Sequence, residues 1–229
     1  MKRVILNVLL GAVMIIFFSA YGSGNEMTSI FKGREVVTID LVGHGMVTID
    51  WGNGSKEKTY RLEEGNNSYS WKYAQTLSRT IKIIGENITE LYCSEIGLTN
   101  LDISRSPALT ILKCYGNQLT NLDVTKNTML VELNCTNNQL TNLDISNNLV
   151  LEELFCGKNK LTSLDVTKNI VLTKYLSVYK NQLSTEALNA LFGALSNEDS
   201  GTIFIRDNPG TNTCDQSIAT KKKWIVNVE

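Results

Sequence analysis

The sequence has few of the residues with which enzymes usually do chemistry. Its 229 residues include one histidine, His44, which lies between two glycines. It contains no nucleophile elbow, no phosphate-binding loop and no cluster of metal-ligating residues. Paired carboxylates alone can hydrolyse glycosides, so a carboxylate-only hydrolase is the catalytic alternative. We expect a non-catalytic protein that uses neither a metal ion nor a cofactor.

An excess of positive charge is also absent. Lys and Arg number 22, against 23 Asp and Glu. Residues 1–22 hold two basic residues and no acidic ones, so without them the counts become 20 and 23 and the net charge is −3. Proteins that bind nucleic acid usually present a basic patch to the phosphate backbone. We therefore expect no nucleic-acid partner.

The apolar run at the N-terminus is shorter than a membrane-spanning helix. Lys2 and Arg3 precede the run 4–18, whose 15 residues fall below the ~20 that cross a bilayer. Ala20 and Gly22 then place small residues at the positions that a signal peptidase reads, and no cysteine nearby suggests a lipid anchor. We predict a signal peptide over 1–22 that is cleaved rather than kept as an anchor. The mature chain is then secreted, periplasmic or at the cell surface, without a membrane span.

One pattern returns every 21 residues over the range 88–183. It reads L-x-x-L-x-C-x-x-N-x-L-T-x-L-D-(I/V)-(S/T)-x-N, and its copies open at Ile88, Leu109, Leu130, Leu151 and Leu172, the last with one inserted residue. Burying about five apolar side chains gives roughly 8 to 15 kcal/mol per repeat, whereas ordering its backbone costs roughly 20 to 40 kcal/mol. One repeat therefore cannot fold alone, and the period indicates a solenoid of stacked repeats.

The pattern resembles that of the leucine-rich-repeat family. The family signature L-x-x-L-x-L-x-x-N-x-L is matched by Leu130, Leu133, Cys135, Asn138 and Leu140. The resemblance implies an α/β solenoid, in which a right-handed superhelix carries a parallel β-sheet on its concave face. The nearest kind is the secreted bacterial, internalin-like leucine-rich-repeat protein, which implies adhesion to or recognition of an extracellular protein or glycan.

Three residue types recur at fixed positions of the repeat, and each suggests a structural role. The asparagines are expected to point inward and satisfy backbone groups of a tight turn. The aspartates are expected to bond their own backbone two residues on, with calcium binding as the alternative. The spacing of glycines in calcium-binding solenoids is absent. The positions are Asn117, Asn138, Asn159 and Asn181 for the first type, and Asp102, Asp123, Asp144 and Asp165 for the second.

The third recurring type is cysteine, at Cys93, Cys114, Cys135 and Cys156. Neighbouring strands place equivalent residues about 4.8 Å apart with parallel Cβ vectors. A disulfide needs Cβ atoms about 3.8 Å apart and side chains that turn toward each other. A straight row also cannot surround a tetrahedral zinc ion. We expect four buried thiols that act as small apolar groups, and no partner for Cys214.

Both ends of the solenoid differ from the repeats. Residues 30–87 contain short alternating runs and glycine turns, which predict a small antiparallel β-module that caps the first repeat. Within it, residues 49–54 resemble a corner of polycystic-kidney-disease-type immunoglobulin-like sandwiches, with Asn53 in place of the family's Asp. We expect Trp51 and Trp71 in the core of this module rather than at a ligand.

Residues 184–229 predict a longer helical repeat and a C-terminal cap. Ser184 is a candidate N-cap for a helix that follows it, and residues 203–208 recover the strand motif as a sixth strand. Asp215 is a candidate cap for a short helix that extends through Lys223, and residues 225–228 predict a closing strand.

Function should lie on the outward side chains of the strands. One outward row is Tyr92, Lys113, Asn134, Phe155, Ser177 and Phe204, and the next is Ser94, Tyr115, Thr136, Gly157, Tyr179 and Arg206. Five of these twelve residues are aromatic, against 7% of the chain, and aromatic residues and Arg commonly anchor interfaces. We predict a binding face for an extracellular protein or glycan on a monomeric chain. Its residues are Tyr92, Lys113, Tyr115, Phe155, Tyr179, Phe204 and Arg206. The alternative is a structural component of the cell surface, whose rings only stack to stiffen the sheet.

Overall fold

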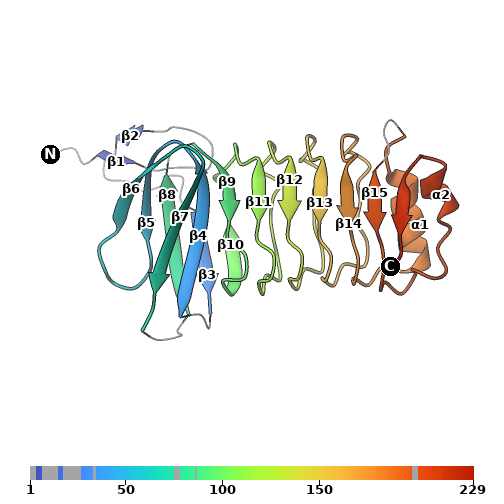
Figure 1. The fold of residues 1–229 in the computed structure, drawn as a ribbon, viewed down its shortest axis with the longest axis horizontal. Coiled ribbons are helices and arrows are strands. Elements are labelled where there is room, and N and C mark those ends of the chain that lie inside the picture. The colour runs from blue at the N-terminus through green and yellow to red at the C-terminus, as the bar shows by residue number, and fades with distance from the viewer. Residues whose placement is uncertain are drawn as a thin grey trace.

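The computed structural model describes residues 4–6, 15–17, 27–32, 35–74, 78–85, 87–197 and 201–229. It is elongated, with long strands at the N-terminal end followed by a row of short strands (Figure 1). Within residues 1–22 it describes only β1 (Val4–Leu6) and β2 (Ile15–Phe17), which pair antiparallel. The rest of the predicted signal peptide lies outside the described residues, so the signal peptide stays a prediction.

The repeats form the parallel part of one long sheet. Its neighbouring strands pair in register, so that Leu112 lies beside Leu133 and Leu133 beside Leu154. Each strand spans only three to five residues, because the 21-residue period leaves the remainder for the turns and the return. The strands, in spatial order, are β9 (Ile88–Tyr92), β11 (Ile111–Lys113), β12 (Glu132–Asn134), β13 (Glu153–Phe155), β14 (Tyr175–Ser177), β15 (Thr202–Phe204) and β16 (Ile225–Asn227).

The N-terminal strands are not a separate unit. β4 (Val36–Gly43) pairs antiparallel with β9 on one side and with β7 (Asn66–Lys72) on the other, so it extends the repeat sheet. A second sheet has the order β10-β3-β8-β5-β6. Its strands are β3 (Met27–Phe31), β5 (Gly45–Asp50), β6 (Lys58–Leu62), β8 (Arg79–Gly85) and β10 (Leu98–Asp102).

This arrangement differs from the predicted boundary at 30–87. The second sheet begins at Met27, and β10 comes from the first repeat and pairs antiparallel with β3. In the later repeats the equivalent segment is an irregular return. The physical reason is that the first return has a strand beside it with free hydrogen-bonding groups, whereas the later returns lie beside one another.

Aromatic residues hold the two N-terminal sheets together. Trp51 is 1% exposed, and Tyr73 donates a hydrogen bond from its hydroxyl to the Trp51 carbonyl at 2.6 Å. Trp71 stacks on Trp51 with ring centroids 6.3 Å apart. The core prediction is confirmed for Trp51. Trp71 is only partly buried, and Lys58 Nζ lies 4.9 Å from its ring centroid.

The C-terminal end is helical, as predicted. α1 (Thr185–Ala194) has Ser184 as its N-cap, whose side chain accepts a hydrogen bond from Ala187 N at 3.2 Å. α2 (Ser217–Thr220) is shorter than predicted, and Asp215 accepts from Ser217 N at 3.0 Å without being its N-cap residue. Among the residues that the structure describes, no helix combines the length and apolar character needed to cross a bilayer.

Candidate recognition surface

The predicted asparagine ladder lies inside the solenoid and joins successive repeats. Asn138 Oδ1 accepts from Leu119 N at 3.0 Å, and its Nδ2 donates to the carbonyls of Cys114 and Cys135, each at 3.0 Å. One side chain therefore joins two successive repeats. The same set of bonds occurs at Asn117, Asn159 and Asn181, and Asn208 continues it.

A second asparagine ladder was not predicted, although the residue closes the repeated pattern. Asn148 is fully buried and donates from Nδ2 to Val124 O at 3.0 Å and to Asn127 O at 2.8 Å. Asn127 and Asn169 make equivalent bonds. In all three, Oδ1 is buried without a hydrogen-bond partner among the described residues. The two ladders thus differ in how completely their amides are satisfied.

The aspartates stabilise turns, as predicted. Asp123 Oδ1 accepts from Thr125 N at 2.9 Å and from Thr125 Oγ1 at 2.7 Å. These two bonds to Thr125 lower the pKa of Asp123. Asp102, Asp144 and Asp165 bond the residue two positions on in the same way.

The four repeat cysteines are free and buried in one inward row. Burial raises the pKa of Cys93 and of Cys135 to about 12, because an apolar interior disfavours the thiolate. Cys114 is raised well above its ordinary pKa for the same reason, as is Cys156. Free buried thiols agree with the sequence prediction. Cys214 lies apart at the C-terminal end and is only partly buried.

The first predicted outward row is present in strict register. Tyr92 lies beside Lys113 and Lys113 beside Asn134, and the row continues through Phe155, Ser177 and Phe204. The second row follows the same order, because the parallel backbone hydrogen bonds continue beyond the strands. Glu95 N donates to Tyr115 O, and Lys180 N donates to Arg206 O. The structure therefore brings all seven predicted site residues to one side of the sheet.

Contacts on the sheet face cover part of the aromatic surface of these two rows. Arg206 lies over the Tyr179 ring, with 5.1 Å from Cζ to the centroid. Phe155 stacks on Tyr175, with centroids 6.2 Å apart. Tyr115 is 38% exposed and Arg206 is exposed, while the other five predicted residues are half-buried. Ser177 is buried. The surface is thus less open than a simple outward pattern suggests.

A third outward row precedes the two predicted ones and carries most of the charge. It runs through Glu90, Ile111, Glu132, Glu153, Tyr175 and Thr202. Glu132 Oε1 lies 2.9 Å from Lys113 Nζ, and Lys113 Nζ lies 5.6 Å from the Tyr92 ring centroid. Alternation along the strand would have revealed this row, because its residues stand two positions before the first row.

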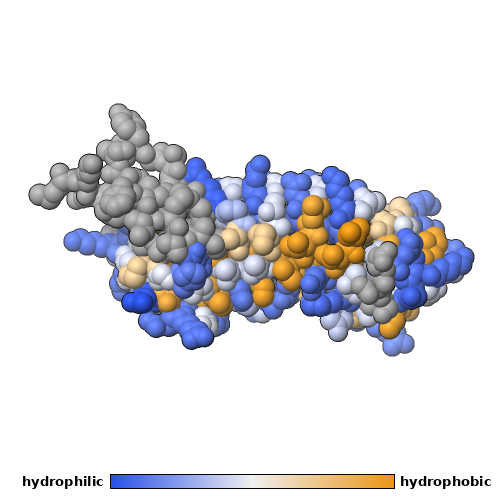
Figure 2. All heavy atoms as spheres, turned by 90° about the horizontal axis from the view of Figure 1, so that it is seen from above, coloured by the Kyte–Doolittle hydropathy of each residue, from blue (hydrophilic) through white to orange (hydrophobic). Residues whose placement is uncertain are grey.

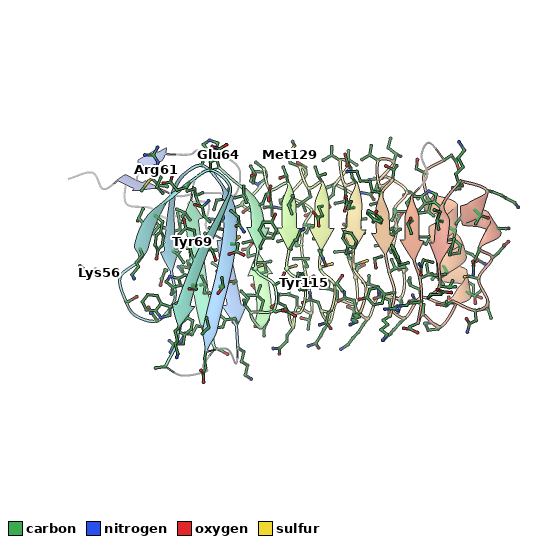
Figure 3. All side chains as sticks on the ribbon, viewed as in Figure 1. Lys56, Arg61, Glu64, Tyr69, Tyr115 and Met129 are labelled. Atoms are coloured by element: carbon green, nitrogen blue, oxygen red, sulfur yellow. The ribbon has the colours of Figure 1, made fainter. Side chains whose placement is uncertain are left out.

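The sheet face is hollowed where β4 joins the repeats. The hollow has a volume of about 400 Å³ and is lined by residues of β4, of β9 and the turn after it, and of β11 and the turn after it. Figure 3 labels Tyr115 below the short strands of the repeats. The lining residues are Val36, Thr38, Asp40, Tyr92, Ser94, Glu95, Ile96, Lys113 and Tyr115. No repeat pattern indicates this hollow, because β4 lies outside the period.

An apolar ridge runs along another edge of the repeats, where the chain enters each strand. Its residues immediately precede the leading leucine of a repeat, and Figure 2 shows orange side chains gathered over this part of the solenoid. Figure 3 labels Met129 at this edge, above the strands. The ridge comprises Met129, Leu149, Val150, Ile170 and Val171, which are 38% to 64% exposed. It is a second surface, separate from the predicted face.

No family model and no curated protein matches the sequence. Among solved structures, the functional domain of InlJ from Listeria monocytogenes, described as including a cysteine ladder, is 32% identical with a TM-score of 0.50. That match covers 61% of this chain and 30% of the InlJ chain. The internalin InlF from Listeria monocytogenes is 20% identical with a TM-score of 0.42, over 60% of this chain and 46% of the other.

The chain therefore spans less than half the length of either internalin. The feature named for the InlJ domain is present here, because Cys93, Cys114, Cys135 and Cys156 form a buried row across adjacent strands. The parallel strands, the 21-residue period and the match to InlJ all indicate leucine-rich repeats. Over these repeats the chain is similar to the internalin InlJ.

Proposed function

We propose that the chain is an exported or surface-associated recognition module that binds an extracellular protein or glycan without catalysis. The binding face is the outward side of the repeat sheet, which we infer to be the concave face of a right-handed superhelix. The likeness to internalins supports a recognition or adhesion role. We also propose that the protein is a monomer and that it is secreted, periplasmic or held at the cell surface.

The observation that carries this proposal is the outward aromatic surface. Inward positions are filled by similar apolar residues in every repeat, whereas the two predicted outward rows change from strand to strand. Tyr115, Phe155 and Tyr179 lie on this surface in three different repeats. Large aromatic side chains that are partly accessible are the residues that most often dominate binding energy.

The alternative is a structural component without a specific ligand. The contact of Phe155 with Tyr175 and that of Arg206 with Tyr179 favour it, because they use ring faces within the sheet itself. Tyr115 does not fit this alternative, since it is 38% exposed and makes no ring contact among those described. Its exposure makes Tyr115 the first residue to test.

The test is an array of glycans and host proteins probed with the purified protein and with Tyr115→Ala and Phe155→Ala. Truncation of an interface anchor should weaken binding by about tenfold or more. Met129→Ala is the matched control, because Met129 is a large exposed side chain on the ridge and not on the sheet face. If a ligand binds both face variants as tightly as the parent, the face assignment is wrong. If Met129→Ala alone weakens binding, the ridge is the binding surface.

A further inference from the structure

The hollow between β4 and the first repeats has the size and walls of a side-chain pocket. Its volume of about 400 Å³ lies at the lower end of the range typical of ligand pockets. Such a volume holds one or two side chains rather than a long oligomer. Three separate chain segments line it, one from the N-terminal strands and two from the first repeats. It therefore exists only because β4 pairs with β9 through Asp40 and Tyr92.

Negative charge dominates the surroundings of the hollow. Asp40 and Glu95 line it, and Glu90 lies beside it, accepting a hydrogen bond from the Tyr92 hydroxyl. The one ammonium in the lining belongs to Lys113, which already forms an ion pair with Glu132 at 2.9 Å. Two carboxylates therefore line the hollow and two more bond its wall residues Tyr92 and Lys113, against one ammonium, so a ligand of positive charge is favoured over a neutral or acidic one.

Two further observations agree with a cation. Asp40 Oδ1 is buried without a hydrogen-bond partner among the described residues, so this carboxylate has an acceptor that the chain itself does not use. Burial is the main cause that raises the pKa of Tyr92, and the hydrogen bond to Glu90 and the charges of Glu90, Glu132 and Asp40 add to it. The phenol therefore stays neutral. Its hydroxyl donates to Glu90, and its ring is one that a cation already approaches, since Lys113 Nζ lies 5.6 Å from the ring centroid.

The aromatic walls favour a guanidinium over an ammonium. Tyr92 and Tyr115 both line the hollow, and a planar guanidinium can stack on a tyrosine ring while it donates to a carboxylate. The chain uses the same contact elsewhere, since Arg206 lies over Tyr179 at 5.1 Å and Arg79 over Tyr73 at 5.2 Å.

We propose that this hollow receives an arginine side chain of a protein partner, held by Asp40 and by the rings of Tyr92 and Tyr115. This inference rests on the proposed function, because the hollow opens on the same face of the sheet. It adds the class of partner, a protein with an exposed arginine, and it places one anchor of the interface at the junction with the N-terminal strands. A neutral glycan would leave the charge of the hollow unused.

The test uses nuclear magnetic resonance titration of the purified protein with Nα-acetyl-arginine amide. The matched probe is Nα-acetyl-citrulline amide, which has nearly the same shape and no charge. We expect saturable shifts of the amide signals of residues 92–96 with a dissociation constant on the order of 1 mM for the arginine probe. The citrulline probe should bind at least about tenfold more weakly, because it cannot form the charged hydrogen bonds.

Variants complete this experiment. Asp40→Asn should remove the shifts, whereas Asp144→Asn, which changes an exposed aspartate in a distant turn, should leave them unchanged. Equal binding of the citrulline probe, or of Nα-acetyl-lysine amide, would overturn the assignment of arginine. Preferential binding of a neutral oligosaccharide in the hollow would also overturn it.

If array ligands depend on Phe155 but not on Asp40, only the hollow assignment fails. If arginine binds in the hollow while Phe155→Ala leaves array binding unchanged, the wider face assignment fails instead.

Discussion

The inward and outward sides of the repeat sheet obey different rules, although they belong to the same strands. Inward positions hold similar apolar residues in each repeat, so that Leu112, Leu133 and Leu154 lie side by side and are fully buried. In the two predicted outward rows the residue changes from each strand to the next. Lys113, Asn134 and Phe155 are neighbours in one outward row.

Stacking explains the difference. An inward side chain meets its own copies above and below, so one residue type that packs well is suitable at every level. An outward side chain faces solvent or a partner, and no neighbour requires it to repeat. The period therefore records the requirements of folding, and departures from it on the outward side are free to serve binding. The predictions below test this separation, beginning with the side that folding controls.

Leu133→Ala should give the largest loss of stability. Leu133 is fully buried in β12, and removing a buried leucine side chain costs about 2 to 5 kcal/mol because of lost burial and the cavity that remains. Leu149→Ala is the control, since Leu149 is 53% exposed on the ridge and should cost less than about 0.5 kcal/mol. Urea unfolding measures both. Similar losses would show that inward packing does not control stability.

Asn138→Ala should come next and should exceed Asn148→Ala. The first change strands the Leu119 amide and two carbonyls, at roughly 1 to 3 kcal/mol for a buried group left without a partner. The second change strands two carbonyls but also removes the unpartnered Oδ1 of Asn148. Lys126→Ala, an exposed change, should cost less than about 0.5 kcal/mol. Equal melting temperatures for Asn138→Ala and Lys126→Ala would refute the role of the ladder.

The inward side could be predicted from the sequence because the 21-residue period assigns each residue to an equivalent position in every repeat. Once Asn117 and Asn138 stand 21 residues apart, they must occupy equivalent places in neighbouring repeats, and each must bond the repeat before it. The same logic placed Cys114 beside Cys135. The unpartnered oxygens of the second ladder could not be foreseen, because they depend on which backbone groups the turn already pairs.

The outward side was predictable only as rows of positions. That Arg206 covers Tyr179, and that Lys113 lies between Glu132 and Tyr92, depends on side-chain conformations that no period constrains. The hollow was not predictable at all. It requires Asp40 to pair with Tyr92 in an antiparallel register, and nothing in the short runs of residues 30–87 specifies that strand as the neighbour of the first repeat.

The cysteine row should make stability fall at alkaline pH. The Cys135 pKa is about 12 in the folded protein, against about 8.5 in an unfolded chain. The free energy of unfolding is unaffected by this thiol's ionisation below pH ~8.5. It falls as the pH rises toward ~12, because only the thiol of the unfolded chain ionises in that window. The loss is at most about 1.4 kcal/mol per pH unit for each thiol. Cys135→Val should reduce the slope between pH 9 and 11, and Val178 fills the same inward position in its own repeat. An unchanged slope would exclude this thiol as a cause.

Thiol labelling sharpens the same contrast without changing the sequence. In the native protein at pH 8, a maleimide should react first with Cys214, which is partly buried, and should spare the four buried cysteines of the repeats. All five should react after unfolding in denaturant. Mass spectrometry counts the labels. Rapid native labelling of four or more thiols, or a mass that shows disulfides, would contradict the buried row.

Gly157→Ala should have the smallest effect on stability and a clear effect on the outward surface. A Cβ added at Gly157 would lie 2.3 Å from the Tyr179 ring, so the ring must move. The backbone there is not in the left-handed region, and replacing glycine by alanine at such a site gains about 0.4 to 1 kcal/mol by restricting the unfolded chain. That gain offsets the lost ring contact, and the net change should stay within about 0.5 kcal/mol. Thr136→Ala, one repeat earlier on the same row, is the control. Nuclear magnetic resonance signals of the Tyr179 ring should shift in Gly157→Ala and not in Thr136→Ala. Unshifted signals would show that Tyr179 is not held over Gly157. A large loss of stability would show that the outward side also serves folding.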